Sequence, residues 1–201
     1  MDTYKTIKKR SEGIYKEKGS KFIGLAFPVF NEEQVKKILE DLRKEFHDAR
    51  HHCYAYRLGA NMDKYRVNDD GEPSSSAGKP IFGQIQSFEL SNILIVVVRY
   101  FGGTKLGVSG LINAYRTAAS EAIQAADVYQ GIVMEKHKIM FEYPAMNDVM
   151  TVIKDENLEQ SNQQFELSCS LTLHIRESES NRILQRLEKI ETVKSQHLET
   201  S

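Results

Sequence analysis

ILIVVVRYFGGTKLGVSG, residues 93–110, predicts a buried strand, a glycine-rich loop and the start of a helix. The strand Ile93–Val98 is apolar and mostly β-branched on both faces, which is typical of a central strand covered on both sides. This run is far shorter than the ~20 residues that a membrane span needs, so we expect no membrane segment. A loop at 101–108 follows. Small and apolar residues at helical spacing from 109 to about 126 predict a helix packed closely on the sheet.

The chain before this strand predicts further elements of the same domain. In order, they are a hairpin, a helix, a strand, a polar loop and a short helix: 11–29, 31–47, 52–58, 61–79 and 80–90. The hairpin turns at Gly19-Ser20. Asn31, with Gln34 three residues later, has the spacing of a capping box, which predicts where the helix begins.

The chain after residue 130 indicates a second domain. Residues 165–175 alternate between apolar and polar side chains, which predicts a strand with one buried face and one solvated face. The segments alternate as strand, helix, strand, strand, helix and strand: 132–143, 146–153, 158–161, 165–175, 183–190 and 193–198. This order, βαββαβ, is ferredoxin-like. With Gly131 as the junction, we expect an α+β protein with two domains, residues 1–130 and 131–201.

The composition excludes several classes of protein. The 201 residues carry 27 Lys and Arg against 28 Asp and Glu, and 40% are hydrophobic, which excludes global disorder and a histone-like polycation. Cys53 and Cys169 are far apart, which excludes a disulfide scaffold and a zinc site made only of cysteines, and fits a reducing compartment. No apolar stretch follows the first residues, MDTYKTIKKR, so we expect no secretory signal and a cytoplasmic protein.

The loop DDGEPSSSAGKP, residues 69–80, is the most unusual stretch. A P-loop ending in Gly78-Lys79 needs Gly at position 73 and Ser or Thr at position 80, but both are proline, which argues against nucleotide hydrolysis. The three carboxylates could hold Mg²⁺ or Ca²⁺, but no acid closes a calcium-binding loop. We favour a structural interpretation in which Asp69 and Asp70 cap a turn and Glu72 is solvated.

Two other constellations leave alternatives open. The loop at 99–109 leads into a helix, whose free N–H groups, with Lys105 and Ser109, could bind a phosphate or carboxylate. Alternatively, its glycines only permit a tight crossover. A zinc site at 47–53 is disfavoured because no second ligand pair stands at metal-site spacing. A serine nucleophile within 74–76 is disfavoured because no Gly-x-Ser-x-Gly motif is present.

Four stretches together resemble a known family: EKGSKFIG (17–24), HDARHHC (47–53), DDGEPS with AGKPI (69–74, 77–81) and VRYFGGTKLG (98–107). They are similar to the YigZ/IMPACT family. The resemblance implies an N-terminal two-layer α/β domain like the second domain of a small-subunit ribosomal protein, with a left-handed crossover. It implies a C-terminal domain similar to the last domain of elongation factor G. Ser75 and Ser109 stand where the family has glycine, so positive φ is disfavoured at both.

The resemblance also implies a function. The eukaryotic member regulates translation by competing for the activator of a stress kinase. Our first hypothesis is therefore a non-enzymatic, translation-linked binding protein, monomeric and without metal or cofactor, that contacts RNA or a ribosome-associated protein. Tyr100 and Phe101 could stack on bases. The alternative is an enzyme or sensor for a small anionic ligand, which Asp70 or Glu72 near Lys105 around a cavity would favour.

The central expectation is that the two glycine-containing loops meet in space. No catalytic residue is assigned. The candidate binding residues are Arg50, His51, Asp69, Asp70, Gly71, Glu72, Ser74, Ser75, Ser76, Lys79, Arg99, Tyr100, Gly102, Gly103, Lys105 and Ser109.

Overall fold

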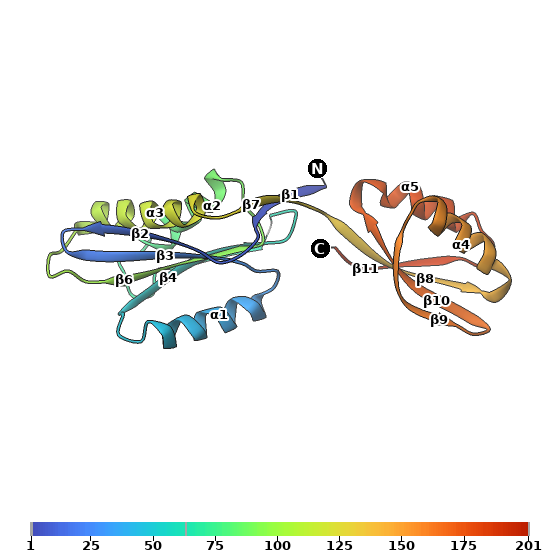
Figure 1. The fold of residues 1–201 in the computed structure, drawn as a ribbon, viewed down its shortest axis with the longest axis horizontal. Helices are drawn as coiled ribbons and strands as arrows, with labels where there is room; N and C mark the ends of the chain where they lie inside the picture. Colours follow the sequence, from blue (N-terminus) through green and yellow to red (C-terminus); the bar gives the residue numbers. More distant parts are fainter. Residues whose placement is uncertain (1, 63, 201) are drawn as a thin grey trace. The chain divides into compact units, whose positions relative to one another are not determined.

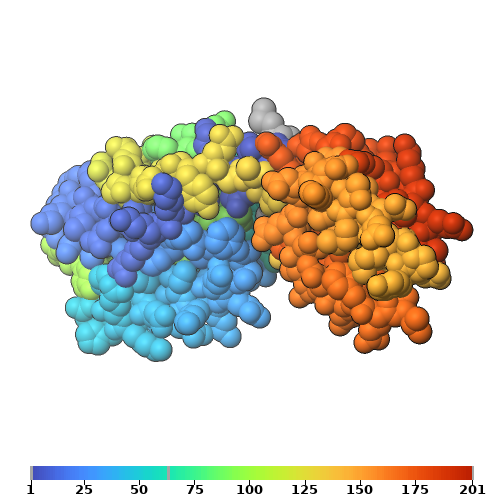
Figure 2. Space-filling view, turned by 45° about the vertical axis from the view of Figure 1, so that its right-hand side comes forward, coloured from blue at the N-terminus to red at the C-terminus, as the bar shows by residue number. Residues whose placement is uncertain are grey.

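The computed structural model describes residues 2–62 and 64–200, and these form two compact units. Tyr4–Gly131 makes up the first unit, and the chain after Gly131, together with Asp2 and Thr3, makes up the second. Figure 2 shows the surface of the first unit in blue to yellow and that of the second in orange to red. Both units combine helices with sheets, so the α+β class is confirmed.

The first unit is built on a five-stranded antiparallel sheet in the order β2-β3-β6-β4-β5. Its strands are β2 (Ser11–Glu17), β3 (Ser20–Pro28), β4 (His51–Leu58), β5 (Lys64–Asn68) and β6 (Ile93–Tyr100). Its helices are α1 (Glu32–Glu45), α2 (Gly78–Ser87) and α3 (Gly107–Gln124). The apolar strand β6 lies in the middle, as its sequence predicts. Asn31 caps α1, because its side chain accepts the backbone N–H of Gln34 at 2.9 Å.

Helices cover both faces of this sheet. Leu94, Val96 and Val98 of β6 pack on the α1 side, while Ile93, Ile95 and Val97 pack beneath α2 and α3. Figure 1 shows α1 on one side of the sheet and α2 and α3 on the other. The resemblance implied two layers, and the structure has a third. The handedness of the β3–α1–β4 crossover stays an expectation.

The prediction of a polar loop at 61–79 is wrong in part, because this segment contains the edge strand β5, which pairs with β4. Asp63 lies outside the described residues. Sequence patterning misses β5 because an edge strand has one neighbour and this one is largely exposed, so no apolar alternation marks it. The short strands β1 (Thr3–Ile7) and β7 (Val128–Ile132) pair in a separate two-stranded sheet, which was likewise not predicted.

The second unit has the ferredoxin-like order and the strand arrangement β11-β8-β10-β9. Its elements are β8 (Met134–Glu142), the 3₁₀ turn η1 (Tyr143–Ala145), α4 (Met146–Asp155), β9 (Glu159–Phe165), β10 (Ser168–Arg176), α5 (Glu177–Glu188) and β11 (Lys194–Thr200). The strand predicted at 165–175 corresponds to β10, which begins at Ser168, three residues later than predicted. Phe165 ends β9, and Leu167 is 92% exposed in the turn between the two strands. No helix in the described part of the chain is both long and apolar enough to span a bilayer.

Candidate binding site between two loops

The loop between β5 and α2 is organised around the carboxylate of Asp69. Its oxygens accept the backbone N–H groups of Ser75 (2.8 Å), Ala77 (3.0 Å) and Gly78 (2.8 Å). The residue at the N-cap of α2 is Ala77, which has no side chain able to cap the helix. Asp69 therefore supplies the cap from eight residues upstream, satisfying donors that a helix start leaves unpaired.

Asp70 fixes this loop to the sheet. Its carboxylate accepts the backbone N–H of His52 at 2.6 Å and a guanidinium N–H of Arg43 at 2.8 Å, and its carbonyl accepts Nδ1–H of His51 at 2.8 Å. Burial raises the pKa of Asp70, but the His52 N–H and Arg43 lower it by more, so the pKa lies below its ordinary value. The prediction that Asp69 and Asp70 cap a turn is confirmed for Asp69 alone, because the Asp70 carboxylate bonds to β4 and α1 instead.

Glu72 is not solvated, and this prediction is wrong. Its side chain is only 4% exposed and pairs with Arg99, which is 8% exposed, at 2.6 Å. The same carboxylate oxygen accepts the hydroxyl of Tyr115 at 2.7 Å. Sequence reasoning missed this arrangement because the two partners come from β6 and α3, 27 and 43 residues further along the chain.

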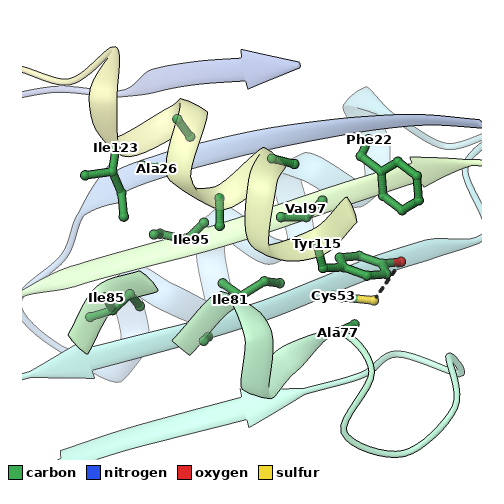
Figure 3. Close-up of a cluster of buried hydrophobic side chains, with 14 of the residues drawn as sticks. Phe22, Ala26, Cys53, Ala77, Ile81, Ile85, Ile95, Val97, Tyr115 and Ile123 are labelled. Carbon is green, nitrogen blue, oxygen red and sulfur yellow. Dashed lines mark hydrogen bonds between the residues drawn. The ribbon is translucent and has the colours of Figure 1, made fainter. Parts of the chain in front are cut away.

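Tyr115 connects the ion pair to the core. Its hydroxyl lies 3.3 Å from Sγ of Cys53, and Figure 3 shows the two side chains directed at each other beside Ala77. Burial raises the pKa of both the tyrosine hydroxyl and the cysteine thiol. Both groups therefore stay neutral and serve as hydrogen-bonding parts of the core.

The two loops meet around a pocket of about 470 Å³. This volume falls within the range of small-ligand sites, ~300–1,000 Å³. The pocket combines cations with apolar side chains, and its lining residues are Arg50, His51, Glu72, Pro73, Arg99, Phe101, Lys105, Leu106, Gly107, Val108 and Leu111.

The charge of the pocket is positive. Arg50 and Lys105 have no ion-pair partner among residues 2–62 and 64–200, while Glu72 is neutralised by Arg99. Nε of Arg99 is buried without a hydrogen-bond partner among those residues. Helix α3 begins at the pocket with no side-chain cap, so its first N–H groups are free to meet an anion.

Other predicted site residues lie elsewhere. Tyr100 points to the α1 side of the sheet, where its hydroxyl donates to Asp48 at 2.7 Å. Gly102 packs on the first hairpin, and a Cβ there would lie 1.8 Å from the carbonyl carbon of Gly19. Buried Ser76 donates to the carbonyl of Pro73. The remaining predicted residues belong to the two loops or to the first turns of the helices that follow them, but they do not line the pocket. They are Asp69, Asp70, Gly71, Ser74, Ser75, Lys79, Gly103 and Ser109.

Ser75 adopts a φ of +64°, so the expectation that serine avoids positive φ there is wrong. The three backbone bonds to Asp69 hold this turn and compensate for the conformational cost. Ser109 lies within the first turn of α3 and is not among the described residues with positive φ.

Comparison with known proteins gives consistent matches. The family model for the Impact N-terminal domain matches residues 18–123. IMPACT family member YvyE of Bacillus subtilis is 28% identical over 90% of this chain and 83% of its own length. IMPACT family member YigZ of Escherichia coli is 33% identical over 68% of each chain. A crystal structure described as a hypothetical protein has a TM-score of 0.77 and 25% identity, covering 99% of this chain and 98% of that one.

Proposed function

The chain belongs to the IMPACT family, and from this premise we propose that it is a regulatory binding protein connected with translation. The resemblance supplies the connection, because the eukaryotic member regulates translation by competing for a protein partner. We assign the partner to the pocket between the two loops. The observation that supports this assignment is that unpaired Arg50 and Lys105 stand around the same cavity as a set of apolar side chains.

The chemistry of the pocket favours a protein partner over RNA. Single-stranded RNA is bound by a groove of several cations with exposed aromatic rings for stacking. Here two unpaired cations stand among five apolar or aromatic side chains, of which only the exposed Phe101 is an aromatic ring, because Tyr100 faces the other side of the sheet. A partner segment that carries a carboxylate next to an apolar side chain fits these groups.

The same groups favour binding over catalysis. The Glu72 carboxylate already accepts two hydrogen bonds and is paired with Arg99, so it is a poor general base. The Cys53 thiol is buried, its pKa is raised, and it contacts Tyr115 and the carbonyl of Asp69. A buried thiol of this kind is a poor nucleophile.

One observation favours a second candidate, an enzyme or sensor for a small anionic ligand. Glu72, Lys105 and the start of α3 surround one cavity of suitable volume. His51 also lines it, with Nδ1 held by the Asp70 carbonyl and no described residue bonded to Nε2. A ligand with a phosphate or carboxylate and a small apolar part would fit.

Site-specific photocrosslinking tests the proposal. The full chain would carry a benzoylphenylalanine at Val108, on the pocket wall, or as a matched control at Phe30, before α1. Both side chains are 53% exposed. We expect Val108 to crosslink a protein of the translation apparatus, and Phe30 not to. Arg50→Glu together with Lys105→Glu should abolish the crosslink, since both cations that meet the partner's carboxylate are reversed.

A crosslink at Val108 that is removed by nuclease treatment would show that the partner is RNA and not a protein. Equal crosslinking at both positions, or none, would overturn the assignment of the pocket. A thermal-shift screen with sugar phosphates, nucleotides and carboxylates tests the second candidate. Stabilisation by one of these compounds in the wild type, but not in the doubly reversed variant, would favour a small anionic ligand.

A further inference from the structure

Three metal-binding side chains converge on one face of the second unit. Glu135 and His137 are two residues apart on β8 and therefore point to the same side of the sheet. His197 of β11 pairs directly with His137 in the antiparallel register. Ligand atoms of the three side chains lie within 4.8 Å of one another, and they are the one such group found among the described residues.

The contacts within this group are close but incomplete. Nε2 of His137 lies 2.8 Å from a carboxylate oxygen of Glu135 and 3.1 Å from the hydroxyl of Ser180 on α5. Nδ1 of the same ring is buried and has no hydrogen-bond partner in the described chain. The rings of His137 and His197 are 5.2 Å apart, inclined at 71°. The existing hydrogen bonds therefore leave part of this buried imidazole unsatisfied.

The surroundings leave the carboxylate available. In the described chain, Glu135 forms no ion pair with Lys or Arg, and its hydrogen-bond partners are His137 and Ser180. The neighbouring Lys136 lies on the opposite face and pairs with Glu199. His137 is buried, whereas His197 is exposed, so the group opens to solvent on one side. This opening gives an entry path on the side of His197, whose Nε2 lies 3.0 Å from the Thr200 hydroxyl.

We propose that Glu135, His137 and His197 bind a Zn²⁺ ion. Two imidazoles and one carboxylate form a set that zinc accepts, with a fourth position for water. At zinc–ligand distances of ~2.0–2.2 Å, tetrahedral ligand atoms stand ~3.3 Å apart. To bind zinc, the 2.8 Å contact between His137 and Glu135 must open slightly, and the ligand atoms that are further apart must approach one another. The bulge after His197 gives β11 local freedom for this adjustment.

Zinc bound here would fix β11 to β8. These strands are neighbours at the edge of the sheet, and β11 is largely exposed. A ligand that binds only the folded form stabilises it by mass action. Zinc is thus expected to raise the thermal midpoint of the protein, an effect separate from the pocket of the first unit.

Calorimetry on the tag-free full chain, stripped with EDTA, tests the site by titration with ZnCl₂. We expect one ion per chain, with an affinity at least about tenfold lower in Glu135→Gln and in His197→Ala. Neither substitution empties the core, and circular dichroism checks that both variants fold. His174→Ala is the matched control. His174 lies on the other face of β10, bonded to Ser161, so this variant should bind zinc like the wild type.

A second readout is the visible spectrum of the Co²⁺-substituted protein, in which tetrahedral nitrogen and oxygen ligation gives characteristic bands. We expect these bands in the wild type and the His174→Ala variant, and their loss in His197→Ala. Absence of stoichiometric Zn²⁺ binding would overturn the proposal. Unchanged zinc binding in the Glu135→Gln, His197→Ala double variant would also overturn it, by placing the metal elsewhere.

Discussion

Glu72 is the residue on which both loops depend. Burying a carboxylate is costly unless it is paired and hydrogen-bonded, and here Arg99 and Tyr115 meet both conditions. The guanidinium of Arg99 also lies over the rings of Phe22 and Phe101, at 5.4 and 5.7 Å from their centroids. This cluster joins the first loop to β6, the second loop and α3.

Replacement of Glu72 by Gln should therefore destabilise the protein strongly. It leaves Arg99 buried without a counter-charge, and breaking a buried pair in this way costs about 3 kcal/mol. Urea unfolding at neutral pH measures the change. Glu40→Gln, on the exposed face of α1, is the control and should leave the unfolding midpoint unchanged. Equal midpoints for both variants would show that the pair contributes nothing.

Asp70 should make the free energy of unfolding depend on pH. Its folded pKa lies below the ordinary value of 3.8, because the His52 N–H and Arg43 outweigh the effect of burial. The ionised carboxylate thus stabilises the fold above that value, and the contribution disappears as the pH falls through the lower folded pKa. We expect the wild type to lose more stability than Asp70→Asn between about pH 6 and pH 2. Parallel pH profiles in urea unfolding would contradict this.

At the scale of elements, the second loop is positioned by close contact with the first hairpin. Gly102 lies against Gly19 and Ser20, and its N–H donates to the Ser20 hydroxyl at 3.1 Å. No side chain fits between the two backbones. Gly19 and Gly102 therefore have a packing role, whereas Gly103 and Gly107 adopt the positive φ that a tight crossover needs.

Two glycine substitutions should have opposite effects. Gly102→Ala places a Cβ 1.8 Å from the backbone of Gly19, so it should lower stability and displace the loop. Gly83→Ala, within α2, meets no atom within 4 Å and should raise stability by about 0.5–1 kcal/mol. Thermal and urea unfolding of both variants check this. A stable Gly102→Ala variant would show that the close approach is not required.

Elements with strong local patterns were predictable, and those set by distant partners were not. The strand β6 and the capped helix α1 follow directly from apolar runs and from Asn31 with Gln34. The exposed edge strand β5 has no such pattern. Within the site, the loops themselves were recognisable from the sequence. The burial of Glu72 and the orientation of Tyr100 toward the α1 side of the sheet depend on tertiary partners. The pairing of His137 with His197 depends on strand register, which spacing in the sequence does not reveal.

At the scale of the whole molecule, the two units differ in charge. Basic residues outnumber acidic ones between Tyr4 and Gly131, and acidic residues outnumber basic ones after Ile132. The net charge of the chain is therefore near zero although its first unit is basic. This basic unit contains the pocket, and its charge suits an anionic partner. The zinc site belongs to the acidic second unit, so the two proposals can fail independently.

The most direct test of the central claim is the rate of reporter synthesis in a reconstituted translation system that contains the purified full chain. We predict that the wild type changes this rate, and that the variant with Arg50→Glu and Lys105→Glu does not. Lys79→Glu reverses an exposed charge outside the pocket and should act like the wild type. A doubly reversed variant as active as the wild type, or a wild type without effect, would contradict the claim that this pocket acts on translation.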